Sequence, residues 1–192
     1  MIIKMDTECI VNDWSSSIGY HESKVEAGVA ELISSGSSME GSAEEKAIDF
    51  DYTNSLNNKL RVKGFDIPFT FDKSDKVTDA MAIEICHDFM DRFGFEDRPF
   101  LLYKHEDTDN THFHLVVSNT DWDGKINERL SGFYRKEATL FAREYEEKYN
   151  LKRLSEIGKG QQSKSQKEVN SEKYAYQKAL IKAVDSGIFL PE

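Results

Sequence analysis

The sequence lacks several features that would define its class. It has two cysteines, Cys9 and Cys86, which are too few and too scattered for a disulfide framework or a zinc ribbon, so a reducing compartment is expected. No apolar run approaches the roughly 20 residues of a membrane span, and residues 1–6 become charged too early for a signal peptide. We therefore expect a cytoplasmic protein with no membrane span.

Basic side chains are also scarce, with 25 Lys and Arg residues against 35 Asp and Glu residues. Residues 151–192 hold eight basic and five acidic side chains, so residues 1–150 hold 17 against 30 and carry a net charge of −13. Proteins that bind nucleic acid usually show a basic surface. Binding of DNA by bulk electrostatics is therefore not expected, and any contact would need local basic clusters and a metal ion.

The chain length suits one domain with a tail. A hydrophobic content of 39% in 192 residues is enough for one well-buried core and small for two. Residues 158–167 have the composition of a flexible linker, and residues 171–184 favour a short helix. We expect a domain at residues 1–150, followed by a linker and helical extension at residues 151–192.

Apolar patterns predict the elements of this domain. The clearest is a helix at residues 78–93, whose apolar residues recur every three or four positions and leave His87 on the solvent side. Ser42 and Glu45 have the spacing of a capping box at the start of a polar helix. The other expected elements are strands at residues 2–10 and 62–71, helices at residues 42–60 and 133–149, and a tight turn at residues 123–124.

Three of the five histidines gather within ten residues. The flanking residues 100–104 and 115–118 have strand composition and the residues between have turn composition, which predicts a hairpin with histidines at its tip. Because side chains alternate along a strand, His112 and His114 point the same way, as do Tyr103 and His105. If these two faces coincide, three imidazoles converge.

Three neutral imidazoles with no thiolate suit a divalent ion such as Mn²⁺, Zn²⁺, Co²⁺ or Ni²⁺, and they leave coordination positions open. A catalytic metal site is built in this way. A single histidine near a strand end usually just faces water, but the spacing of His105, His112 and His114 reverses that expectation.

The hairpin carries a longer pattern, continued by Asp-Trp-Asp-Gly-Lys at residues 121–125: His105-x-Asp107-x-x-Asn110-x-His112-x-His114. It resembles the metal-binding motif of conjugative relaxases, the mobilization endonucleases of the HUH superfamily, and most closely those of mobilizable elements in Bacteroides-like bacteria. The resemblance implies an α/β (α+β) fold, with helices packed on a mainly antiparallel sheet and the histidine hairpin in its centre. It also places the strand at residues 62–71 inside the sheet, whereas Pro68 favours an edge or a bulge, and the conflict stays open.

Residues 17–32 resemble the first motif of the same group, in which a tyrosine precedes Asn-x-x-Lys-Val and, after a glycine, Ala-Glu. Tyr20 falls where the family keeps its nucleophile. His21 replaces the usual asparagine; it could lie near the scissile phosphate or face solvent, and we favour solvent. The candidate DNA contacts, each as typical of a solvated charged face, are Lys24, Arg61, Lys63, Arg129, Arg135 and Lys136.

The resemblance implies an enzyme that nicks single-stranded DNA at a transfer origin. The three histidines would hold a divalent ion, with Mn²⁺ or Mg²⁺ expected and Zn²⁺, Co²⁺ or Ni²⁺ also open, and Tyr20 would form a reversible 5′-phosphotyrosyl intermediate. Asp107 is a candidate acceptor for the free N–H of a ligand imidazole, while Asn110 is a candidate for the same shell or only for the turn. Accessory mobilization and coupling proteins are possible partners, and the chain could be the nuclease portion of a longer relaxase.

Two other functions stay open. A rolling-circle replication initiator uses similar histidines with a tyrosine, but the pattern around Tyr20 favours a relaxase. The non-enzymatic alternative is a metal-stabilised DNA-docking protein in which Tyr20 is only a core aromatic. The main rivals of Tyr20 as nucleophile are Tyr103, on the strand of His105, and Tyr134, at the start of a helix.

Overall fold

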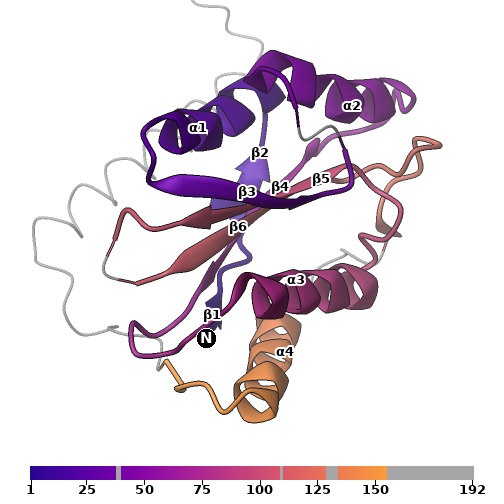
Figure 1. Ribbon diagram of the computed structural model, residues 1–192. Coiled ribbons are helices and arrows are strands. Elements are labelled where there is room, and N and C mark those ends of the chain that lie inside the picture. The colour runs from indigo at the N-terminus through magenta and orange to yellow at the C-terminus, as the bar shows by residue number, and fades with distance from the viewer. Residues whose placement is uncertain (38–39, 109, 129–133, 155–192) are drawn as a thin grey trace, which may run out of the picture. The chain divides into compact units, whose positions relative to one another are not determined.

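A six-stranded sheet lies between two pairs of helices, as Figure 1 shows. The computed structural model describes residues 1–37, 40–108, 110–128 and 134–154. The strands are β1 (Ile2–Ile3), β2 (Ile10–Val11), β3 (Ala30–Ser35), β4 (Gly64–Thr70), β5 (Phe100–His105) and β6 (His112–Ser118). The helices are α1 (Trp14–Glu26), α2 (Ala43–Ser55), α3 (Asp79–Phe93) and α4 (Tyr134–Lys148), with a short 3-10 helix at Thr7–Cys9.

The expected α+β architecture with a central histidine hairpin is confirmed. Every pairing between these strands is antiparallel, and the order is β1-β4-β6-β5-β3. The short strand β2 also pairs with β4, on the same edge as β1. The β5–β6 hairpin therefore lies inside the sheet. Each of its two strands pairs with a neighbour on both edges, and this register determines the face of the sheet on which each histidine lies.

The two faces of the sheet have different chemistry. Along β4, Phe65, Ile67 and Phe69 point to the layer of α3 and α4, where they join the main core. Phe89 of α3 lies edge-on against Phe69, with ring centroids 5.1 Å apart. Burial of each such side chain stabilises the fold by about 1.5–3 kcal/mol. Asp66 alternates with these residues and therefore faces the layer of α1 and α2.

Both predicted helix signals are confirmed. In α2 the Glu45 amide donates to Ser42 Oγ at 3.3 Å and the Ser42 amide donates to Glu45 Oε2 at 2.7 Å, so the capping box is complete. The helix ends at Ser55, earlier than the expected residue 60. In α3, Thr78 caps the first turn, and Gly94 ends the helix in the left-handed conformation with φ of 76°.

The prediction of one strand over residues 2–10 was wrong. The Asp6 side chain accepts a 2.9 Å hydrogen bond from the Glu8 amide, which caps the 3-10 turn at Thr7–Cys9 and divides the segment into β1 and β2. This division also settles the position of Pro68. Its carbonyl accepts from the Lys4 amide at 3.1 Å. Pro68 lies between the residues of β4 that pair with β1 and those that pair with β2, so its missing N–H interrupts neither pairing. The strand is therefore internal despite its proline.

Some sequence predictions are not covered by the structure. The strand β3 was not predicted at all, because its serines and its glutamate gave no clear alternation. The described part of the predicted helix at residues 133–149 forms α4. The predicted linker, the extension at residues 171–184 and Arg129 lie outside the described residues, as do the side chains of Tyr134 and Arg135.

Candidate active site

The strand register brings the three histidines together. His105 is the direct cross-strand partner of His112, and Tyr103 is the partner of His114, so all four side chains share the face below α1. One ring nitrogen of each histidine lies within 4.8 Å of those of the other two. The convergence that the spacing of these residues predicted is therefore present.

His21 joins this cluster from α1, and the expectation that it faces solvent was wrong. It is 0% exposed, because Trp14, Ile18 and His21 recur at helical spacing on the side of α1 that packs on the sheet. Its Nδ1 is 3.0 Å from His105 Nε2. Its ring stacks on that of Tyr103, with centroids 4.7 Å apart. The i, i+4, i+7 stripe was a signal in the sequence that could have placed His21 inside.

Asp66 is the carboxylate of the site, and sequence reasoning missed it. From the α1 face of β4, its Oδ1 accepts a 2.7 Å hydrogen bond from His114 Nδ1, and its Oδ2 lies 3.0 Å from His21 Nε2. Because Asp66 occupies the second face of a strand whose first face is phenylalanine and isoleucine, an unexpected acidic position was visible in the pattern. His21, Asp66 and His114 form a second group with metal-ligand chemistry.

Burial and mutual repulsion favour the neutral forms of His105 and His21. Burial, together with the neighbouring His114, His21 and His112, lowers the pKa of His105 to about 3. Burial also lowers the pKa of His21, although Asp66 opposes the shift. Burial would raise the pKa of Asp66, but the hydrogen bonds from His114 and His21 outweigh it and hold that pKa well below its usual range.

These residues fit a divalent metal ion. They bring imidazole nitrogens next to one carboxylate, which is a common donor set for divalent transition metals. In addition, His105 Nδ1 is buried and has no hydrogen-bond partner within the described part of the chain. A buried nitrogen lone pair without a donor is accounted for if it binds a cation.

Tyr20 lies beside the cluster on the solvent side. Its ring centroid is 5.1 Å from that of His21 and 6.2 Å from that of His105, and its side chain is 51% exposed. Lys24, one turn further along α1, holds its ammonium group 5.3 Å from the centre of the Tyr20 ring. The Lys24 ammonium also donates to Asp107 of the hairpin, which ties the end of α1 to the turn between β5 and β6.

Asn110 and Asp107, two residues of the turn between β5 and β6, contact His112 in different ways. The Asn110 backbone carbonyl accepts from His112 Nδ1 at 3.1 Å, so a neutral His112 has its lone pair on Nε2. Asp107 Oδ1 is 3.6 Å from His112 Nε2, too far for a hydrogen bond. The imidazole N–H for which Asp107 was a candidate acceptor is thus bound by a backbone carbonyl at His112 and by Asp66 at His114.

Comparison with protein families decides the class. Residues 20–151 match the family described as "Relaxase: MobA/VirD2-like, nuclease domain". The chain belongs to this family. No curated protein matches the sequence significantly. As members of this family are DNA-nicking relaxases, residues 20–151 form a relaxase nuclease domain, and the prediction of a relaxase from the two motifs is confirmed.

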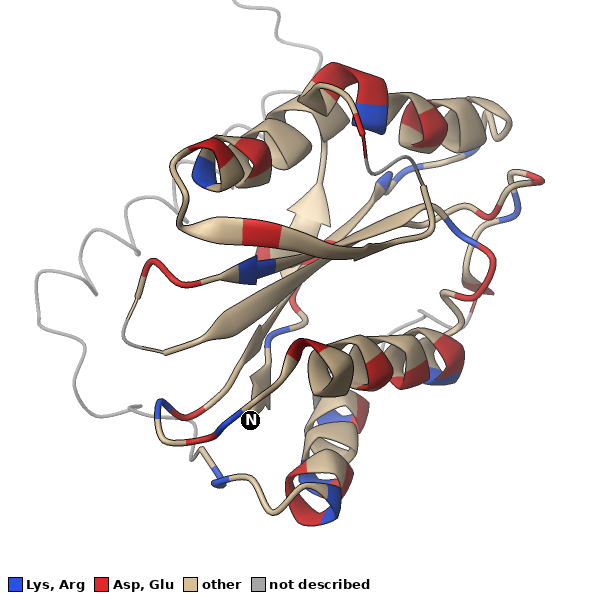
Figure 2. Cartoon of the chain, viewed as in Figure 1, with Lys and Arg blue, Asp and Glu red and all other residues tan. Residues whose placement is uncertain are grey.

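The candidate DNA contacts of the relaxase domain do not form one surface. Lys24 is at the histidine cluster, whereas Arg61 and Lys63 precede β4 at the end of the sheet where Gly64 pairs with Ser118, away from the histidines. Lys63 pairs with Asp51 at 3.3 Å. Lys136 is exposed on α4, on the other side of the sheet. Acidic residues occur on all four helices in Figure 2, in line with the negative charge of the domain.

Tyr103 is a poor rival to Tyr20 in the relaxase site. It is fully buried, and its hydroxyl donates to Glu22 Oε1 at 2.6 Å. Burial and the Glu22 carboxylate raise the pKa of Tyr103 far above the usual value for a phenol. This hydroxyl is therefore held as a donor and does not ionise near neutral pH.

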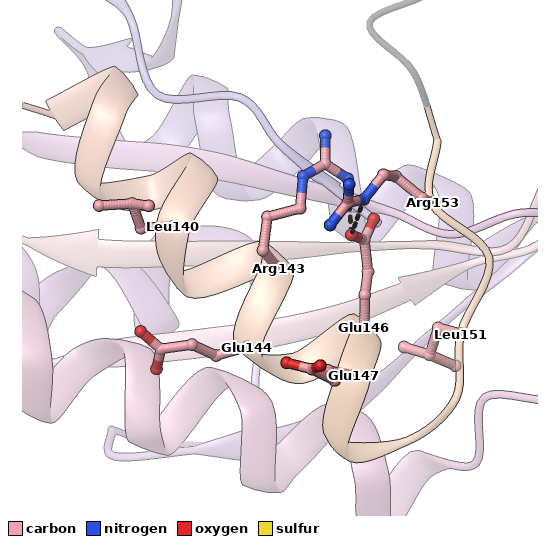
Figure 3. Close-up of a pocket in the computed structure, with 7 residues that line it drawn as sticks. All are labelled: Leu140, Arg143, Glu144, Glu146, Glu147, Leu151 and Arg153. Carbon is pink, nitrogen blue, oxygen red and sulfur yellow. Dashed lines mark hydrogen bonds and ion pairs between the residues drawn. The ribbon is translucent and has the colours of Figure 1, made fainter.

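A hollow of the relaxase domain lies along the C-terminal part of α4, and Figure 3 shows its lining. Arg143 donates to Glu146 at 2.6 Å, and Arg153 lies 3.7 Å from the same carboxylate. The amino group of Met1 donates to Glu146 Oε1 at 2.5 Å. Because three cations surround this buried acid, the hollow is a structural clamp between the first strand and α4.

None of the described helices is long and apolar enough to cross a membrane.

Proposed function

We propose that this relaxase domain cuts one strand of a transfer origin for conjugative mobilization, with Tyr20 as the nucleophile that attacks the scissile phosphate. The observation that carries the proposal is the position of Tyr20 at the edge of a three-histidine cluster. Its side chain is half exposed, and its ring centroid is 6.2 Å from that of His105. The same exposure argues against the non-enzymatic alternative, in which Tyr20 would be a core aromatic.

His105, His112 and His114 would hold the divalent ion. Three imidazole nitrogens favour Mn²⁺ over Mg²⁺, which prefers oxygen ligands and retains its waters, while Zn²⁺, Co²⁺ and Ni²⁺ also suit nitrogen. When bound, such an ion supplies Lewis-acid polarisation of a non-bridging phosphate oxygen and helps to place the phosphate. The protein side chains provide the nucleophile and its activation.

Lys24 supports the ionised form of the nucleophile. A phenol is a poor nucleophile until it loses its proton, and a nearby ammonium group stabilises the resulting phenolate. The Lys24 ammonium lies over the Tyr20 ring and is fixed by Asp107, so this charge stays at the site. The phenol proton passes to solvent, the Tyr20 oxygen forms a bond to phosphorus as the bond from phosphorus to the 3′ oxygen breaks, and the departing oxygen takes up a proton from solvent.

The product explains why cutting can be undone. One phosphodiester is replaced by one phosphotyrosyl ester of similar energy, so the free 3′-hydroxyl can attack the adduct and rejoin the strand. This reversibility suits a cytoplasmic enzyme that stays bound to the cut strand during transfer and rejoins its ends afterwards. Accessory mobilization and coupling proteins are the proposed partners of such a complex.

The experiment is a covalent-adduct assay with the full chain. A single-stranded oligonucleotide that carries the transfer origin of the host element is incubated with Mn²⁺ and protein, and the adduct is detected on a denaturing gel. We expect an adduct with the natural protein and with Tyr52→Phe, a matched exposed tyrosine on α2, but none with Tyr20→Phe. A phosphotyrosyl peptide that maps to any tyrosine other than Tyr20 would refute the assignment.

A further inference from the structure

The loop between β4 and α3, residues 71–78, lies next to the histidine hairpin. Thr70, the last residue of β4, is the cross-strand partner of His112, so the two side chains share the face of the sheet below α1. The Phe71 amide donates to the Thr111 carbonyl at 3.3 Å, which holds the start of the loop against the turn between β5 and β6. In Figure 1 the loop and this turn lie at the same end of the sheet. The loop therefore borders the place proposed for the scissile phosphate.

The acidic side chains of this loop are already bound within the protein. Asp72 Oδ1 accepts from the Ser74 amide at 3.0 Å and from the Ser74 hydroxyl at 2.6 Å. It also lies 3.6 Å from the Lys152 ammonium. Asp75 accepts from the Lys152 amide at 3.0 Å. Neither carboxylate is therefore bound to the lysine that follows it in the loop.

Lys73 and Lys76, the two basic residues of the loop, are exposed. Neither makes an ion pair or a hydrogen bond with a residue that the structure describes. Lys24, on the other side of the hairpin turn, is by contrast paired with Asp107. Residues 1–150 carry a net charge of −13, so two unpaired ammonium groups at the histidine end of the sheet are an exception in this domain. They are available to an anion from outside the protein.

The open side of the histidine cluster is over β4. The residues of β5 that face the α1 layer are buried, namely Leu101, Tyr103 and His105. The residues of β4 on the same face remain partly exposed, namely Asp66, Pro68 and Thr70. A DNA strand bound at the histidines therefore has free surface along β4, and this surface ends at the loop.

We infer that Lys73 and Lys76 bind backbone phosphates of the single-stranded DNA next to the phosphate that Tyr20 attacks. The inference rests on the proposed function, which places the scissile phosphate at the histidine cluster. A lysine binds phosphate as a point charge, and phosphate contacts position a strand without reading its sequence. The acidic charge of the domain is compatible with this role, because two local contacts need no basic surface.

Lys59 and Arg61 provide a matched comparison. They are also exposed and have no ion pair or side-chain hydrogen bond to the described residues, but they precede β4 at the end of the sheet away from the hairpin. If DNA were attracted by bulk charge alone, loss of either pair of cations would have the same effect. A phosphate site at the loop predicts an effect for Lys73 and Lys76 only.

The first test measures the salt dependence of DNA binding by fluorescence anisotropy. Full-length Tyr20→Phe protein, which is not expected to cut, is titrated in Mn²⁺ onto a labelled single-stranded origin oligonucleotide, alone and combined with Lys73→Gln and Lys76→Gln. Each phosphate contact on a single strand contributes about 0.7 to the slope of log affinity against log salt, so we expect the slope to become shallower by about 1.4. Lys59→Gln with Arg61→Gln should keep the slope of the parent protein. Equal slopes for the two double substitutions would overturn the inference.

The second test locates the phosphates. Methylphosphonate groups, each of which removes the charge of one phosphate, are placed singly along the oligonucleotide. One or two of them should weaken binding to the parent protein but have no further effect when both loop lysines are replaced, which is the coupling expected of a direct contact. These positions should lie within a few nucleotides of the phosphate that the natural protein joins to Tyr20. Additive losses at every position, or coupling only at remote phosphates, would contradict the inference.

These outcomes separate the inference from the proposed function. Anisotropy requires no cutting, so the salt slopes decide whether the loop binds phosphates even if Tyr20 forms no adduct. Conversely, a protein that forms the adduct but keeps its salt slope without the two loop lysines would retain the proposed function and lose the inference. Thermal unfolding checks that the variants are folded, which is expected because both lysines are exposed.

Discussion

The Tyr103 hydroxyl donates a 2.6 Å hydrogen bond to Glu22 Oε1, which joins the centre of the sheet to α1 beneath the candidate active site. The other oxygen of Glu22 pairs at 2.7 Å with Lys46, a buried lysine of α2. A single carboxylate thus connects three elements. Because Glu22 follows His21 and Tyr20 directly in α1, this junction sets how the two residues face the histidine cluster.

Removing the Tyr103 hydroxyl should therefore affect stability more than chemistry. In Tyr103→Phe the ring that stacks on His21 is retained, while Glu22 loses a buried donor but keeps Lys46. We expect the free energy of unfolding to fall by about 1–3 kcal/mol in urea titrations, because the lost bond is to a charged group. Mn²⁺ affinity and adduct formation should persist.

Tyr145→Phe is the matched control, since it removes a phenol that donates to Asp88 on the opposite side of the sheet. It should also leave adduct formation unchanged. Loss of the covalent adduct in Tyr103→Phe alone would show that Tyr103 takes part in the reaction, against its buried position.

The histidine cluster should account for metal binding. His112→Ala combined with His114→Ala removes two of the three proposed ligands but no core residue, since both side chains are partly exposed. We expect calorimetry to detect one Mn²⁺ site in the natural protein and none in the double variant. His87→Ala, which removes an exposed histidine of α3, should bind as before. Unchanged Mn²⁺ affinity in the double variant would rule out this site.

Mild acid should destabilise the metal-free fold. The pKa of His105 is about 3 in the folded protein against 6.5 for the free side chain, so the unfolded chain takes up the proton first. The stability contributed by neutral His105 is complete above about pH 6.5 and is lost as the pH falls toward 3. For one such group the loss between pH 8 and pH 5 is about 2 kcal/mol.

Urea midpoints in chelator between pH 8 and pH 5 check this expectation, and the window lies above the range in which carboxylates titrate. His21, whose pKa is also lowered, adds to the effect in the same direction. The exposed His87 offers a control, because His87→Ala should retain the full pH dependence. A midpoint that does not change over this range would contradict a buried neutral His105.

The hairpin and its metal ligands could be predicted because their signals are local. Alternation fixes which residues of one strand share a face, and three histidines on two adjacent strands can meet only if the strands pair in register. The capping box at Ser42 and the apolar stripe of α3 are local in the same sense. Such patterns need no knowledge of distant parts of the chain.

The residues that complete the site could not be found in this way. His21 is 84 positions from His105 and 45 positions from Asp66, so their contacts depend on how α1 crosses the sheet and on where β4 enters it. The division of the first strand depends similarly on one capping side chain, Asp6. Long-range packing, rather than composition, decides these features.

DNA binding should depend on the metal more than on bulk charge. Since residues 1–150 carry a net charge of −13, few phosphates are expected to be neutralised by basic side chains. Fluorescence anisotropy with origin DNA should show a shallow dependence of log affinity on log salt, and most of the affinity should disappear in chelator. A steep salt dependence that persists in chelator would show that many Lys and Arg contacts carry the binding.

The position of Lys24 gives the last prediction. Its ammonium lies over the Tyr20 ring and donates to Asp107, so Lys24→Met removes this cation from the proposed nucleophile and keeps a side chain of similar length. The rate of adduct formation at neutral pH should fall by about tenfold or more, because the developing phenolate loses its electrostatic support.

The pH dependence distinguishes this role from simple loss of DNA binding. Lys24→Met should regain rate as the pH is raised, since the phenolate then forms without the ammonium group, whereas a defect in DNA affinity would remain at every pH. Lys104→Met is the matched control, because Lys104 belongs to β5 of the histidine hairpin but pairs with Asp79 and Glu106. Single-turnover rates at saturating DNA between pH 6 and pH 9 measure the effect. Equal rates for Lys24→Met and Lys104→Met at all pH values would show that Lys24 has no part in activating Tyr20.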